Sequence, residues 1–230
     1  MVKVRTVPRL AKARPATPAP PSQFAAKTAM MTWPKGQVIH RIHLDRYGPA
    51  QFNPGLAGNA RFSPIRNEEG GPIPTLYGGT SFECAAMETV FHDVPFTARL
   101  KTLDKARLAG QVHSRLEPRQ DLLLVDLSAT ALRRLGLRRT QLIDTEKDRY
   151  PGTRAWAAAW HAALPEVQGL CWISRQDDRA LALVLFGDRL PGDVLAPVGE
   201  PRAVLGSIEA LTELTVLADR IGVKLVAGKA

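Results

Sequence analysis

The alternation of apolar and polar residues predicts a mixture of strands and helices. Residues 37–44 (QVIHRIHL) alternate, so a strand there would place Ile39, Arg41 and His43 on one face. The apolar runs 122–127 and 181–186 are typical of buried strands, and residues 169–175 predict another strand with Ser174 near its end. Residues 128–135, capped by Ser128, and 208–221 are expected to be helical, whereas 107–115 fits either a helix or a strand.

Residues 75–91 (TLYGGTSFECAAMETVF) predict a strand, a glycine turn and a helix. Gly78 and Gly79 allow a sharp turn, and Thr80 followed by Glu83 fits a capping box. Glu88 then falls about two turns into the helix, among mainly apolar neighbours. A carboxylate in such a place needs a cleft or an ion-pair partner, unless it lies on the helix surface at the edge of the apolar stripe. Glu88 is therefore the first candidate site residue.

Three more polar side chains precede Glu88. Arg41 lies in the middle of its strand and faces either solvent or a ligand. Arg61 follows a loop rich in glycine and asparagine, where it is either solvated or free to reach a ligand without packing into the core. Tyr77 is a strand residue that fits a core position as well as a ligand contact. Either arginine could instead form a structural ion pair with Glu88.

Together, these separated segments resemble the RES domain family, which is named for an Arg, a Glu and a Ser. The likeness covers roughly residues 38–190. It departs from the family pattern at Phe62, where a tryptophan is common, and in a longer loop over 65–74. The matching pieces, in chain order, are Arg41, Arg61-Phe62, Leu76-Tyr77 with the Glu88 helix, Gly152 with Trp156, the Ser174 strand and the strand 181–186.

This resemblance implies a compact α/β (α+β) domain with a mixed sheet, similar to the ADP-ribosyltransferase fold. NAD would be its substrate, with no bound cofactor. Relatives look like toxins that split the nicotinamide–ribose bond, by hydrolysis or with phosphate, and that are silenced by an Xre-type antitoxin. The family pattern implies a catalytic set of Glu88, Arg41 and Tyr77. Arg41 and Arg61 would hold the pyrophosphate or ribose, Tyr77 would contact the nicotinamide or ribose, and Ser174 would complete the pocket.

The residue types suit that chemistry independently. Cleavage of the bond gives the ribose oxocarbenium character, which a fixed carboxylate such as Glu88 stabilises in the transition state. Nicotinamide leaves as a neutral molecule, so no general acid is required. A guanidinium grips phosphate through two parallel hydrogen bonds, as Arg41 and Arg61 would.

Other patterns argue against alternative sites. The five histidines are scattered and only Cys84 and Cys171 accompany them, so no metal site is predicted. Trp156 and Trp160 are a helical pair expected to pack in the core or at a partner interface and not to bind a ligand. Gly78-Gly79 lacks the wider glycine spacing of a Rossmann fingerprint, so any NAD site is of another kind.

Composition predicts where the domain begins and in which compartment the protein is found. Residues 1–40 carry seven Lys or Arg and no acid, so +7 of the net charge of +9 lies there and +2 remains. With its prolines, segment 1–36 is expected to be a disordered basic arm, and 37–230 the RES-like domain. The nearly neutral domain makes nucleic acid an unexpected partner. No apolar run is long enough to span a membrane, and two isolated cysteines suit a cytoplasmic protein.

Three functions remain open at this point. The first is an NAD glycohydrolase or phosphorylase. The second is an ADP-ribosyltransferase that uses the same pocket on a macromolecule. The third is a non-catalytic module that binds through its basic arm or an antitoxin-like partner. Release of nicotinamide from NAD distinguishes the first, and transfer of label from NAD to a macromolecule the second.

Overall fold

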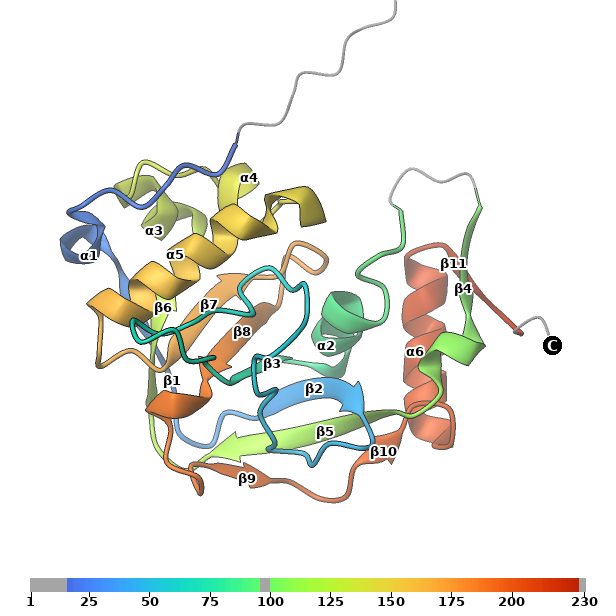
Figure 1. Cartoon of the computed structure of the whole chain (residues 1–230). Coiled ribbons are helices and arrows are strands. Elements are labelled where there is room, and N and C mark those ends of the chain that lie inside the picture. The colour runs from blue at the N-terminus through green and yellow to red at the C-terminus, as the bar shows by residue number, and fades with distance from the viewer. Residues whose placement is uncertain (1–15, 96–99, 228–230) are drawn as a thin grey trace, which may run out of the picture.

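The chain forms a curled, mostly antiparallel sheet with helices packed against it (Figure 1). The computed structural model describes residues 16–95 and 100–227. Within these ranges the nine-stranded sheet has the order β1-β6-β7-β8-β3-β2-β5-β10, and β9 also pairs with β5. Only the β6–β7 pair of this sheet is parallel. The strands are β1 (Met30–Trp33), β2 (Ile39–Leu44), β3 (Thr75–Gly79), β5 (Gln111–Pro118), β6 (Leu122–Asp126), β7 (Gly169–Ile173), β8 (Leu181–Phe186), β9 (Leu195–Pro197) and β10 (Arg202–Ala203).

The predicted fold class, a mixed α/β domain, is confirmed. The runs 122–127, 169–175 and 181–186 form β6, β7 and β8, and the alternating segment forms β2. Residues 107–115 divide between a short 3-10 turn (Lys105–Leu108) and the start of β5. The likeness to the ADP-ribosyltransferase fold stays a prediction.

Two groups of helices build two apolar clusters beside the sheet (Figure 1). Helices α3 (Ala129–Arg134), α4 (Arg139–Leu142) and α5 (Tyr150–Ala163) pack near β6, β7 and β8. Trp156 and Trp160 are fully buried there, which confirms their predicted packing role. Helices α2 (Phe82–Thr89) and α6 (Ile208–Arg220) form the second cluster beside β2. The candidate site described below lies where these clusters meet.

A small parallel pair, β4 (Lys101–Asp104) with β11 (Val223–Val226), packs against α6. Neither strand was predicted, because their pairing joins segments far apart in the sequence. Helix α6 itself matches the predicted 208–221 helix closely, and Ser128 caps α3 as expected by accepting from the Ala131 N–H.

The expected disorder of the arm does not hold for residues 16–36, the part of it that the structure describes. Residues 16–36 contain α1 (Phe24–Lys27) and β1, which pairs antiparallel with β6. Phe24 packs edge-on against Trp156, and the Trp156 indole N–H donates to the Pro18 carbonyl at 2.7 Å. Trp33 is fully buried. These aromatic contacts outweigh the local charge and proline content on which the expectation rested. Residues 1–15 lie outside the described residues.

The turn between β3 and α2 shows one further difference from expectation. Ser81, and not Thr80, caps α2 by accepting from the Cys84 N–H at 3.0 Å. The Thr80 hydroxyl instead accepts from the Leu181 N–H at 3.2 Å, which ties the turn to β8. This N-cap, shifted by one residue from the predicted one, leaves Glu88 in the helix as predicted.

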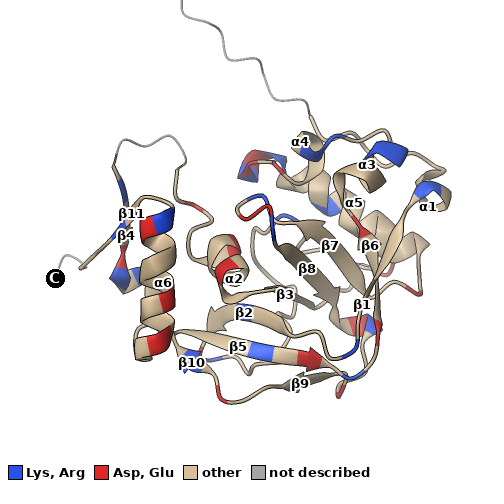
Figure 2. Cartoon of the chain, turned by 180° about the vertical axis from the view of Figure 1, so that it is seen from behind, with Lys and Arg blue, Asp and Glu red and all other residues tan. Residues whose placement is uncertain are grey.

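Charged residues are spread over the described part of the chain in both signs (Figure 2). Basic positions lie on α1, α3 and α4, while α6 carries acids and bases together. Within residues 16–95 and 100–227, none of the helices has the length and apolar character needed to cross a membrane.

Candidate active site

A cavity of about 360 Å³ lies between β2, β3, helix α2 and the start of α5. Ligand pockets commonly occupy about 300–1,000 Å³. Four of the predicted site residues line it: Arg41, Arg61, Tyr77 and Glu88. The structure therefore brings these sequence-distant side chains to one cavity, and it places Ser174 in contact with Glu88 behind the wall.

Glu88 occupies the last turn of α2 with its side chain 16 % exposed. Its Oε1 accepts a hydrogen bond from the Ser174 hydroxyl at 2.7 Å, and its Oε2 lies 3.8 Å from Arg61 Nη1. The second contact is an ion pair too long to count as a hydrogen bond. One carboxylate oxygen is thus held in place while the other keeps acceptor capacity toward the cavity.

Ser174 directly follows β7 and is fully buried. Its hydroxyl oxygen accepts the N–H groups of Gln176 and Asp177, both at 3.1 Å. Its carbonyl accepts from Arg139 Nη2 at 3.0 Å, and Arg139 is paired with Asp144. The serine is therefore fixed by its own turn and by α4, as a side chain that positions a carboxylate needs to be.

Arg61 is buried, with 4 % of its side chain exposed. Its Nε and Nη2 have no hydrogen-bond partner, although both are buried. Its guanidinium carbon lies 5.8 Å from the ring centre of Tyr150. Buried charged donors without partners are expensive, so this arrangement indicates a place for an anionic or polar ligand. The neighbouring Phe62 is fully buried, which fixes the loop that carries the arginine.

Tyr77 lines the cavity from β3 and stands edge-on to Trp172, with ring centres 6.4 Å apart. Its hydroxyl oxygen accepts from the Phe62 N–H at 3.1 Å. Burial raises the pKa of Tyr77 to about 12, against an opposing hydrogen bond with Ser63. The phenol is tethered and neutral, so its ring, and not its hydroxyl, is the part free to meet a ligand.

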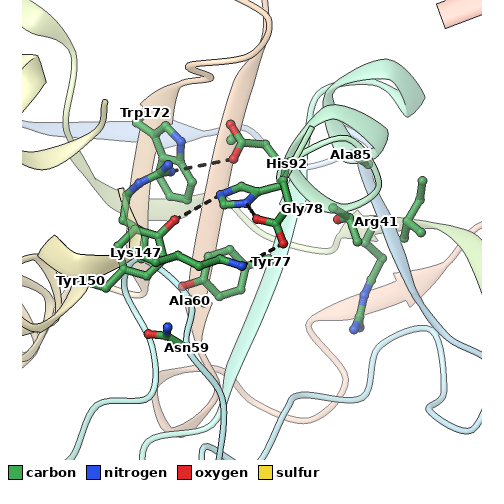
Figure 3. Close-up of a pocket in the computed structure, with 16 residues that line it drawn as sticks. Arg41, Asn59, Ala60, Tyr77, Gly78, Ala85, His92, Lys147, Tyr150 and Trp172 are labelled. Carbon is green, nitrogen blue, oxygen red and sulfur yellow. Dashed lines mark hydrogen bonds and ion pairs between the residues drawn. The ribbon is translucent and has the colours of Figure 1, made fainter. Parts of the chain in front are cut away.

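Arg41 lines the cavity, but its guanidinium is engaged with the loop that follows β2. Its Nη1 donates to the carbonyls of Pro49 and Gln51, at 2.7 and 3.0 Å. In Figure 3 the Arg41 side chain extends away from Tyr150 and His92. Burial lowers the pKa of Arg41 to about 10, so it stays charged at neutral pH. Its buried Nε has no partner.

Sequence reasoning missed a set of residues on one side of the cavity: His92, Asp93, Lys147 and Tyr150. They form a connected chain of hydrogen bonds (Figure 3). His92 lies four residues after Glu88, the spacing of side chains on the same side of a helix, and this was the signal available. Tyr150 and Lys147 carried no local signal, because they reach the cavity through the packing of α5.

Among the described residues, no group of three or more His, Cys, Asp or Glu side chains is arranged to hold a metal ion. Cys84 and Cys171 are both buried, and burial raises the pKa of each thiol to about 12. They are therefore neutral core residues and not nucleophiles.

Fold and cavity together define a mixed α/β domain in which an acid and a buried arginine with two unpartnered nitrogens face one ligand-sized space. The model of the RES domain family matches residues 38–205, most of the chain. The chain therefore belongs to the RES domain family, which is generally associated with NAD-related toxin function. No curated protein matches the chain significantly.

Proposed function

We propose that the chain is an NAD-consuming enzyme that cleaves the nicotinamide–ribose bond, by hydrolysis or phosphorolysis. A toxin role and restraint by an Xre-type antitoxin belong to the same proposal. The observation that carries it is the buried Arg61 guanidinium with two unpartnered nitrogens, beside the Glu88 carboxylate in one cavity. This pair suits a ligand whose anionic part would lie against Arg61 and whose developing positive charge would lie against Glu88.

Glu88 would act on the ribose. When the glycosidic bond breaks, its electron pair neutralises the pyridinium nitrogen, and positive charge develops on the sugar carbon and ring oxygen. A carboxylate positioned beforehand stabilises this charge at no cost in reorganisation. Ser174 holds Oε1 at 2.7 Å, so the unbonded oxygen is available to face the sugar.

Arg61 would bind the pyrophosphate or a ribose hydroxyl through its free Nε and Nη2. Arg41 would support the same region from the opposite wall, since its Nη1 bonds hold the segment 49–51 and its Nε is unpaired. The Tyr77 and Trp172 rings both line the cavity and offer flat surfaces for the nicotinamide.

The test is release of free nicotinamide from NAD by the purified chain, with and without phosphate. Glu88→Gln should lower the rate by about 10²–10³-fold, the usual effect of removing one electrostatic stabiliser. Glu83→Gln is the matched control, because Glu83 lies on the same helix outside the cavity. Circular dichroism and thermal unfolding should show that both variants are folded.

Two results would contradict the proposal. One is the absence of nicotinamide release by the wild-type chain in either condition. The other is equal activity of Glu88→Gln and Glu83→Gln. Label passing from NAD to a macromolecule would instead point to ADP-ribosyl transfer through the same pocket.

A further inference from the structure

A line of hydrogen-bonded side chains borders the cavity that Glu88 also lines. The Tyr150 hydroxyl lies 3.1 Å from His92 Nε2, and His92 Nδ1 lies 2.9 Å from Asp93 Oδ1. Lys147 Nζ donates to Asp93 Oδ2 at 2.8 Å. All four residues line the same cavity as Glu88 (Figure 3). The cleavage step assigned to Glu88 does not use them.

The partners fix the direction of each hydrogen bond. The hydrogen bond from Lys147 holds the pKa of Asp93 below its usual value, so Asp93 is an ionised acceptor. Nδ1 of a neutral His92 must then carry the proton, which leaves Nε2 to accept from Tyr150. Burial raises the pKa of Tyr150, so its phenol keeps its proton at neutral pH. The lone pairs of its oxygen remain free to accept from a molecule in the cavity.

In NAD hydrolysis the attacking water must lose a proton, and this group of side chains could accept it. This step rests on the function proposed above. When water attacks the ribose carbon, a carbon–oxygen bond forms, the carbon–nitrogen bond breaks and its electron pair goes to nicotinamide. The attacking oxygen must then lose a proton. A phosphate dianion attacks without losing one. Glu88 has another task in this step, because Ser174 bonds one of its oxygens and the other is assigned to the positive charge that develops on the ribose.

We propose that Tyr150, His92 and Asp93 form a proton relay that activates water as the acceptor. Water donates its hydrogen bond to the Tyr150 oxygen, the Tyr150 proton passes to His92 Nε2, and the proton of the water replaces it on Tyr150. The product is an imidazolium between Tyr150 and the Asp93 carboxylate. The His92 side chain is 20 % exposed, so it can release this proton to solvent. Asp93 is a positioning residue that fixes the tautomer.

The experiment compares acceptors in the full chain. Products formed from NAD are separated for wild type, Tyr150→Phe and His92→Ala, first in water alone and then with phosphate or azide as the anionic acceptor. Both variants should lower hydrolysis by about 10²–10⁴-fold, the usual contribution of general base catalysis. Reaction with the anion should fall far less, so the ratio of ADP-ribose to anion adduct drops. Added imidazole should restore part of the hydrolysis by His92→Ala.

Tyr47→Phe is the control, because Tyr47 is a partly exposed tyrosine outside the cavity. It should leave both reactions unchanged. An equal fall in hydrolysis and anion transfer for Tyr150→Phe, without imidazole rescue of His92→Ala, would mean a purely structural role and overturn the relay. Unchanged hydrolysis in both variants would overturn it too. A wild-type chain that releases no nicotinamide with any acceptor would instead overturn the proposed function, and the relay with it.

Discussion

The Ser174 hydroxyl donates a hydrogen bond to Glu88 Oε1 at 2.7 Å. Its oxygen already receives the N–H groups of Gln176 and Asp177, so its single proton is directed at the carboxylate. The turn after β7 therefore sets the orientation of an acid on α2, in a different part of the sequence.

Ser174→Ala should lower kcat for nicotinamide release by roughly 10–100-fold, with a much smaller change in KM for NAD. A hydrogen bond to a charged group contributes about 1.5–3 kcal/mol, and Glu88 would lose its fixed orientation. Steady-state kinetics check this, with Ser128→Ala as control, since Ser128 caps a helix away from the cavity. A rise in KM alone would show that Ser174 serves ligand binding instead.

Arg61→Lys should raise KM for NAD by about 10–100-fold, because the free Nε and Nη2 donors of the guanidinium disappear. The stability of the ligand-free protein should change little, since those donors have no protein partner to lose. Kinetics and urea unfolding measure the two effects. Arg66→Lys is the control, as Arg66 is an exposed arginine in the same loop. A large loss of stability with unchanged KM would contradict the ligand role.

Arg41→Met should destabilise the fold by about 2–3 kcal/mol, because the carbonyls of Pro49 and Gln51 lose a charged donor. Segment 45–60 should also become more open to proteolysis. Urea unfolding and limited digestion measure both effects, with the exposed Arg46→Met as control. Full stability combined with a raised KM for NAD would show that Arg41 acts on the ligand alone.

The protein should lose stability in mild acid through His113, which is 1 % exposed and bonded to His40 and Arg202. Burial, reinforced by His40 and Arg202, lowers the pKa of His113 to about 3 from 6.5. Below about pH 6.5, His113 is therefore protonated in the unfolded chain but stays neutral in the folded chain. The free energy of unfolding decreases as the pH is lowered from about 6.5 toward about 3. By linkage the loss is about 2 kcal/mol at about pH 5.

His113→Gln keeps a donor and an acceptor but does not titrate, so it should flatten this dependence. Urea unfolding at about pH 5 and about pH 8 compares the variant with wild type. An identical acid slope in both proteins would mean that other groups cause the loss. His40, whose pKa burial also lowers, is the next residue to test.

The sequence predicted the parts of this molecule that are encoded locally. Alternation and apolar runs located β2, β6, β7 and β8, and the apolar face of α2 identified Glu88 as a site candidate. Ser174 became a candidate only through the resemblance to the RES family, because a serine at the end of a strand carries no functional signal by itself. Arg61 was recognised as a candidate, but its burial could not be predicted. The residues that cover it include Tyr150 at the start of α5, far along the chain.

What could not be predicted depends on contacts between distant segments. Nothing in the local sequence of this basic, proline-rich stretch marks Phe24 and Trp33 as core residues, because their partners, Trp156 and β6, lie far along the chain. The pairing of β4 with β11 is of the same kind. His92 offered the signal of spacing from Glu88, but its bond to Tyr150 spans 58 positions of the chain.

Gly78 lines the cavity, and a Cβ added there would clash with Ile39 Cγ2 and lie 3.0 Å from the His40 carbonyl oxygen. Because Gly78 has no side chain, β2 and β3 approach closely enough for Arg41 and Tyr77 to line the same cavity. Any larger residue at position 78 would push β2 and β3 apart and displace both strands. The absence of a side chain at Gly78 thus helps to set the width of the cavity. Enlarging the cavity for a bulkier ligand would require substitutions at lining residues other than Gly78.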